Sequence, residues 1–131
     1  MLFHTFHSQE ERRKFGESYF IEFQYCEAAP GTSLEEILSV DAIHMWKNDS
    51  LYLYGDDDNT FFSWYKNIFT DGTYSNGRTG VIDLYGINYY SAEDTEFILK
   101  KLMNTHLPEQ EKLVQWLEKA QSSSGFYILG L

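Results

Sequence analysis

The stretch Gly86-Ile-Asn-Tyr-Tyr-Ser-Ala-Glu-Asp94 decides the fold class, because it joins a strand directly to a helix. Its aromatic and β-branched first half favours a strand, which we expect to span Gly80 to Tyr90. Ser91 and Asp94 have the spacing of a capping box, in which each side chain accepts the backbone N–H of the other residue. The helix that follows is predicted to run to about Asn104, so the domain contains both element types.

Further elements are predicted on both sides of this unit. In Ser18–Cys26, apolar residues alternate with Glu22 and Gln24, which is typical of a strand with one buried face. Leu51–Tyr54 and Phe126–Leu129 are also predicted strands. Besides the Ser91 helix, the predicted helices are Ser33 to about Val40, Glu109 to Gln121, and Phe61–Phe69, where the aromatic content leaves strand equally open. The sequence therefore predicts one α+β domain over residues 1–131, with an antiparallel or mixed sheet of about four strands and three or four helices packed mainly on one face.

The chain is strongly acidic and rich in aromatic residues. It has 20 Asp and Glu against 10 Lys and Arg, a formal net charge of −10, and 18% Phe, Tyr and Trp. A negative field repels nucleic acid and anionic membrane surfaces, and it speeds the encounter with a basic protein. We therefore expect a basic protein partner and neither nucleic acid nor membrane. An acidic surface can also serve solubility alone, and charge by itself does not separate these two explanations.

No catalytic or cofactor motif stands out in the chain. Cys26 is the only cysteine, which excludes an intrachain disulfide and a multi-cysteine metal site. His4 and His7 would share a helix face, but two imidazoles need further ligands to hold zinc. Gly-x-Ser-x-Gly, Walker and Gly-x-Gly-x-x-Gly motifs are missing, so we expect no enzyme activity, no cofactor and no metal. The sequence has no apolar run typical of a signal peptide or membrane span, and a cytoplasmic protein is expected.

The first candidate binding site is the triplet Asp56-Asp57-Asp58, which follows the predicted strand Leu51–Tyr54. Alternate residues of a strand face opposite sides, so Tyr52 and Tyr54 face outward if the two leucines face inward. Tyrosine is a favoured interface anchor. The triplet lacks the ligand spacing of a calcium loop, and a turn with a helix cap is the ordinary alternative. The full candidate set is Asp56, Asp57, Asp58, Asp71, Tyr52, Tyr54 and Tyr74, with Glu35 and Glu36 as a weaker second patch.

The C-terminal third resembles a known class of proteins. The segments are Gly86-Ile-Asn-Tyr-Tyr90 with its capped helix, Trp116-Leu-Glu-Lys-Ala120, and the ending Gly125-Phe-Tyr-Ile-Leu-Gly130. They resemble small bacterial immunity proteins of contact-dependent growth inhibition and other polymorphic toxin systems. The resemblance implies tight, non-catalytic binding to a cognate toxin domain, expected to be a nuclease, whose basic active site is occluded. A sheet edge would be a further place to accept a toxin strand. The alternatives are a non-catalytic adaptor or regulatory protein with another basic partner, and a metal-dependent or hydrolytic enzyme.

Overall fold

The computed structural model describes residues 2–14, 19–44 and 46–130. They form a seven-stranded sheet in the order β1-β3-β2-β7-β6-β4-β5, in which every neighbouring pair is antiparallel. The strands are β1 (Phe3–His4), β2 (Phe20–Tyr25), β3 (Leu51–Tyr54), β4 (Gly72–Tyr74), β5 (Thr79–Gly80), β6 (Ile87–Tyr90) and β7 (Phe126–Leu129). The helices are α1 (Gln9–Lys14), α2 (Leu34–Ile37), α3 (Asp58–Tyr65), α4 (Ala92–Met103) and α5 (Gln110–Gln121), with 3-10 turns η1 (Val40–Ala42) and η2 (Gly55–Asp57).

The α+β class and the antiparallel sheet are confirmed, but the expected count of about four strands is wrong. Strands β1, β4 and β5 have only two or three residues each, too few to produce a recognisable alternation. The predicted strand from Gly80 to Tyr90 is also wrong in its first part, because residues 81–86 form an irregular segment with a turn. Asn88 stabilises that turn, since its side-chain oxygen accepts the Asp83 backbone N–H at 2.8 Å.

The sequence left both helix and strand possible for Phe61–Phe69, and in the structure this segment begins as a helix. Helix α3 ends at Tyr65, and the chain then turns so that Ile68 and Phe69 are also buried. Trp64, which helical spacing places on the apolar face, is 37% exposed instead. Helix α4 has the predicted capping box: the Ser91 hydroxyl accepts the Asp94 N–H, and the Asp94 carboxylate accepts the Ser91 N–H, both at 3.0 Å.

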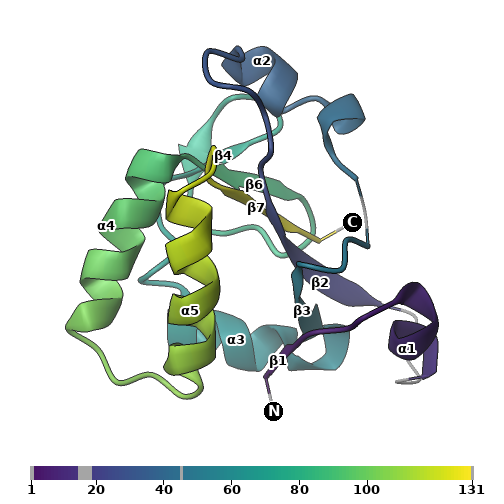
Figure 1. The fold of residues 1–131 in the computed structure, drawn as a ribbon. Helices are drawn as coiled ribbons and strands as arrows, with labels where there is room; N and C mark the ends of the chain where they lie inside the picture. Colours follow the sequence, from purple (N-terminus) through teal and green to yellow (C-terminus); the bar gives the residue numbers. More distant parts are fainter. Residues whose placement is uncertain (1, 15–18, 45, 131) are drawn as a thin grey trace.

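One side of the sheet, here called the helix-covered face, packs against α3, α4 and α5. Figure 1 shows α4 and α5 side by side, with α3 below them. Phe23 lies at the centre of this core, and its ring meets four others edge to face with centroids 5.7 to 6.1 Å apart; these are Phe3, Phe61, Phe69 and Trp116. The three longest helices therefore pack on one face.

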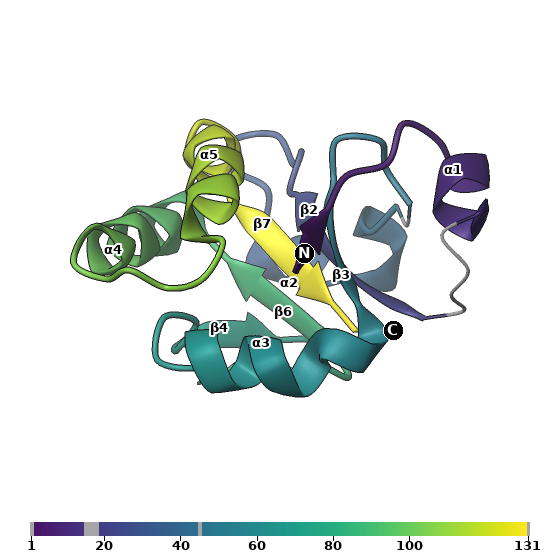
Figure 2. The same cartoon turned by 90° about the horizontal axis from the view of Figure 1, so that it is seen from below.

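The opposite side, the loop-covered face, is buried as well. It is covered by α1, α2, η1 and residues 43, 44 and 46–50. Both Figure 1 and Figure 2 place α1 and the α4–α5 pair at opposite ends of the molecule. The one-sided burial predicted for β2 is therefore wrong, since Glu22 is 0% and Gln24 2% exposed. The Glu22 carboxylate accepts four hydrogen bonds, from Trp46 N (2.8 Å), Lys47 N (3.2 Å), Ser50 Oγ (2.6 Å) and Gln24 Nε2 (3.1 Å). Such partners are what make a buried carboxylate tolerable.

Candidate functional site

The acidic triplet lies where β3 leads into α3. Asp56 is exposed, and Asp57 and Asp58 are partly exposed around the start of the helix. Negative charge is favourable there because it complements the positive end of the helix dipole. The Asp58 carboxylate also accepts the Asn59 backbone N–H at 2.6 Å. Asp57 occupies the N-cap position of α3, but its side chain makes no capping hydrogen bond, so the triplet begins the helix without the side-chain cap that the alternative expected.

Tyr85 approaches the triplet from the segment between β5 and β6. Its side chain is 71% exposed, and its hydroxyl donates to the Asp58 carboxylate at 3.0 Å. This hydrogen bond raises the pKa of Tyr85, and the charges of Asp58 and Asp83 act in the same direction. Tyr19 lies beside them: burial raises the pKa of Tyr19, and Tyr85 and Asp58 raise it further. We call Asp56, Asp57, Asp58, Asp83 and Tyr85 the acidic rim.

The charge of the acidic rim is not neutralised within the described part of the chain. The ion pairs found there join Lys14 to Glu10, Lys47 to Glu27 and Lys100 to Glu96, and none includes a rim carboxylate. The rim therefore presents several carboxylates and an exposed aromatic ring on one edge of the molecule. A basic, partly apolar surface is the complement of such an edge.

The predicted outward orientation of Tyr52 is wrong. Tyr52 does lie opposite Leu51 and Leu53, but the loop-covered face is closed over it and leaves it 2% exposed. Its hydroxyl donates to the Lys47 carbonyl at 2.7 Å, and burial raises its pKa. Tyr54, at the end of the same strand, is partly exposed and packs edge to face on Phe20. Tyr52 is thus a core residue of the loop-covered face.

The remaining predicted residues lie away from the rim. Asp71 and Tyr74 lie beyond the other end of α3, and the Tyr74 hydroxyl donates to the Val81 carbonyl. Glu35 and Glu36 are exposed on α2, over the loop-covered face. The structure therefore brings Asp56, Asp57 and Asp58 together, and it separates the other predicted residues into distinct places.

Asp83 and Tyr85 are rim residues that sequence reasoning missed. Both belong to the segment that was predicted as the first part of a strand. The sequence Asp83-Leu-Tyr-Gly86 does carry a turn signal, because aspartate hydrogen-bonds nearby backbone and glycine tolerates turns. In the structure, the Asp83 carboxylate accepts the Tyr85 N–H at 2.9 Å, as that signal indicates.

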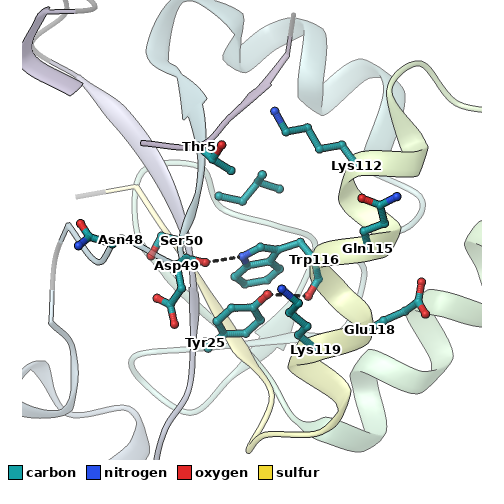
Figure 3. Close-up of a pocket in the computed structure, with 11 residues that line it drawn as sticks. Thr5, Tyr25, Asn48, Asp49, Ser50, Lys112, Gln115, Trp116, Glu118 and Lys119 are labelled. Atoms are coloured by element: carbon teal, nitrogen blue, oxygen red, sulfur yellow. Dashed lines mark hydrogen bonds between the residues drawn. The ribbon is translucent and has the colours of Figure 1, made fainter. Parts of the chain in front are cut away.

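A broad hollow of about 820 Å³ lies between α5 and the turn before β3 (Figure 3). Its floor is formed by Tyr25 and Trp116, whose rings stack with centroids 4.1 Å apart. The Tyr25 hydroxyl donates to the Trp116 carbonyl at 3.0 Å, and the indole N–H donates to the Asp49 carbonyl at 2.9 Å. The side chains around it come from α5 and from the opposite wall; they are Lys112, Gln115, Glu118 and Lys119, and Thr5, Asn48 and Asp49.

The lining of this hollow carries charges of both signs. Its two lysines are balanced by Asp49 and Glu118, and no histidine or cysteine is among the residues that line it. Lys112 is engaged, because its ammonium donates to the Phe3 carbonyl at 3.0 Å. Two hydroxyl groups, those of Thr5 and Ser50, also line the hollow, and the Ser50 hydroxyl donates to the Glu22 carboxylate at 2.6 Å.

The β1 edge of the sheet is closed to a further strand. The Glu109 carboxylate accepts the backbone N–H groups of Leu2 and Phe3, at 2.5 and 3.4 Å. Lys112 covers the Phe3 carbonyl. The edge groups that a toxin strand would need are thus used by side chains near the start of α5. At the other edge, β5 offers only Thr79–Gly80.

Histidine and cysteine show no clustering in the part of the chain that the structure describes. His4 lies in β1 and His7 precedes α1, so they do not share a helix. Cys26 is buried, with its sulfur 3.6 Å from the Tyr127 hydroxyl. Across residues 2–14, 19–44 and 46–130, no three His, Cys, Asp or Glu side chains are arranged to hold a metal ion. Each helix in these ranges is too short or too polar to cross a bilayer.

No family model, curated protein or solved structure matches this chain.

Proposed function

We propose that this protein is a non-catalytic binding protein whose acidic rim holds a basic partner, and that the partner is a cognate bacterial toxin domain. The observation that carries the proposal is the group of unneutralised carboxylates beside the exposed ring of Tyr85. Many basic proteins could bind such a surface, and the resemblance to immunity proteins is the reason for proposing a toxin domain. An adaptor protein would use the same surface.

A nuclease is the expected toxin because of its active-site chemistry. An enzyme that cleaves nucleic acid presents lysine and arginine to phosphate groups. Carboxylates at the start of α3 can occupy those positions in place of phosphates. Opposite charges also steer the two proteins together, with association rates of about 10⁸ M⁻¹s⁻¹ or more at low salt. Tyr85 would then add a desolvated contact that slows dissociation.

The rim is held firmly enough for such a role. Helix α3 is anchored by Phe61 and Tyr65, both 0% exposed, and the Tyr65 hydroxyl donates to the Pro108 carbonyl at 2.6 Å. The Asp58 carboxylate is fixed from two sides, by Asn59 N and by the Tyr85 hydroxyl. A surface that is already ordered loses less entropy on binding.

The test is growth rescue by this chain when it is coexpressed with the toxin domain encoded immediately upstream. The double variant Asp56→Lys and Asp57→Lys is expected to lose protection, and the purified variant to bind more slowly and with a weaker salt dependence. The matched control is Glu93→Lys with Glu111→Lys, which makes the same charge change in the first turns of α4 and α5. The control is expected to protect like the wild type.

Two results would contradict the proposal. Equal protection by the rim variant and the control would show that the rim is wrongly assigned. Failure of the wild-type protein to rescue growth or bind the toxin would remove the toxin as partner and favour the adaptor alternative.

A further inference from the structure

A small cavity lies at the opposite end of α3 from the acidic rim. It has a volume of about 220 Å³ and lies between residues 68–71 and α4. Its polar and aromatic lining consists of Thr70, Asp71, Tyr90, Asp94, Phe97 and Lys101. Of these, only Asp71 belonged to the sequence-based candidate set.

Tyr90 is the unusual residue of this cavity. Its side chain is 1% exposed, and its hydroxyl has no hydrogen-bond partner among the described residues. The ring is fixed by stacking on Phe126, with centroids 4.9 Å apart, and by an edge contact with Phe69. The hydroxyl lies over Gly72, where an added Cβ would be only 2.7 Å from it. A buried hydroxyl without a partner costs about 1–3 kcal/mol, so it requires an explanation.

The other buried tyrosines make this hydroxyl stand out. Each of the four other buried tyrosine hydroxyls donates to a backbone carbonyl at 2.6 to 2.7 Å; they belong to Tyr52, Tyr65, Tyr89 and Tyr127. The fold thus satisfies the hydroxyl groups of its buried tyrosines elsewhere. The Tyr90 hydroxyl is the exception: less than 1 Å² of its oxygen is accessible, so a donor from outside the chain reaches it only when the residues around the cavity move slightly apart.

The charges around the cavity favour a cation. Asp71 and Asp94 line it together with one ammonium group, that of Lys101, which donates to the Thr70 hydroxyl at 2.9 Å. The Asp94 oxygen that accepts the Ser91 N–H is used in the helix cap. Two carboxylates against one ammonium leave a net negative site, which disfavours an anionic ligand. At the mouth, the Phe97 side chain is 56% exposed.

We propose that this cavity receives the guanidinium group of an arginine from the protein partner. A guanidinium has five N–H donors in one plane, enough to reach the Tyr90 oxygen and the carboxylates of Asp71 and Asp94. Its flat face also packs well on an aromatic ring such as Phe97. A lysine offers a compact charge with no such plane. The inference rests on the proposed function, because it assigns a place to one basic side chain of the same partner.

The direct experiment uses a small probe, N-acetyl-arginine methylamide, titrated into the ¹⁵N-labelled protein. Saturable shifts are expected at residues 68–72 and 90–101. Tyr90→Phe should keep or increase stability, because it removes the unpartnered hydroxyl, yet it should weaken probe binding by about fivefold, the equivalent of one lost hydrogen bond. Asp71→Asn should also weaken it. Glu93→Gln, on the exposed first turn of α4, is the matched control and should bind the probe like the wild type.

The inference is overturned if Tyr90→Phe binds the probe as tightly as the wild type, or if no shifts occur at the cavity. It is also overturned if the lysine analogue binds equally well, or if N-acetyl-glutamate binds there more tightly, which would indicate an anion site. These outcomes are distinct from failure of the proposed function. If the probe fails while Asp56→Lys with Asp57→Lys still abolishes protection, the cavity assignment falls and the rim assignment stands.

Discussion

The two faces of the sheet are both buried, but they are closed by different means. On the helix-covered face, rings pack on rings, and Phe23 alone meets four of them edge to face. On the loop-covered face, the neighbouring residue Glu22 holds the segment 46–50, which has no regular structure, through its carboxylate. Both faces contain apolar clusters, but the loop-covered face also contains a fully buried carboxylate, Glu22, that accepts four hydrogen bonds.

This difference bears on the candidate sites. The acidic rim and the Tyr90 cavity lie at the two ends of α3, whose buried side belongs to the ring-packed core. Both sites therefore rest on the helix-covered face. Changes on the loop-covered face should disturb stability while leaving the geometry of α3 intact.

Truncation of the ring core should have the largest effect. Phe23→Ala removes a fully buried ring from the centre of the helix-covered face and is expected to cost about 3–5 kcal/mol in the free energy of unfolding. Urea unfolding followed by circular dichroism measures this loss. The control is Phe97→Ala, since Phe97 is 56% exposed and should change stability by less than about 0.5 kcal/mol. A loss at Phe23 no larger than the control would contradict the central place given to this ring.

The second change is on the same strand and the opposite face. Glu22→Gln replaces an acceptor of four hydrogen bonds by a group with one acceptor oxygen and two donors, so buried N–H groups lose their partner. We expect a loss of about 1–3 kcal/mol, with hydrogen exchange of the Trp46 and Lys47 amides accelerated before that of the sheet. Glu35→Gln, on exposed α2, is the control. Uniform acceleration across the sheet would contradict a local role for Glu22.

Local patterns predicted well those elements whose signals lie within a few residues. Leu51–Tyr54 and Phe126–Leu129 are strands with the predicted bounds, and Ser91 caps α4 as its spacing indicates. The burial of Glu22 was not predictable in this way, because three of the four groups that it binds are 24 to 28 residues away and belong to a segment without periodicity.

The candidate site shows the same limit. The acidic triplet was recognisable as consecutive residues, and its place at a helix start followed from the helix-cap alternative. Tyr85 reaches Asp58 only because residues 81–86 leave the sheet, and this requires the turn that Asn88 stabilises. Tyr52 was misplaced because alternation tells which residues share a face but not whether that face is covered.

A pair of tyrosines on neighbouring strands offers a finer comparison of the two faces. The Tyr127 hydroxyl, on the loop-covered face, donates to the Ile37 carbonyl at 2.6 Å and so holds α2. Tyr127→Phe should cost about 0.5–1.5 kcal/mol, whereas Tyr90→Phe, on the helix-covered face, should cost nothing. Thermal unfolding of the two variants measures the difference. A larger loss for Tyr90→Phe would mean that its hydroxyl is satisfied within the folded chain.

The smallest expected effect is a pH dependence of the free energy of unfolding, caused by His4 in the edge strand β1. Burial lowers the pKa of His4 below its ordinary value of 6.5, and Lys112 lowers it further, while Asp57 and Glu109 oppose the shift. The unfolded chain therefore binds a proton at His4 before the folded chain does, so stability falls as the pH drops through 6.5. The stability difference between pH 7 and pH 5.5 should be smaller in His4→Gln than in the wild type, and unchanged in His106→Gln, whose side chain is exposed. If the stability difference between the two pH values is the same in His4→Gln as in the wild type, the carboxylates of Asp57 and Glu109 cancel the effect of burial on the pKa of His4. The negative field of Asp57 would then reach across the sheet edge to β1.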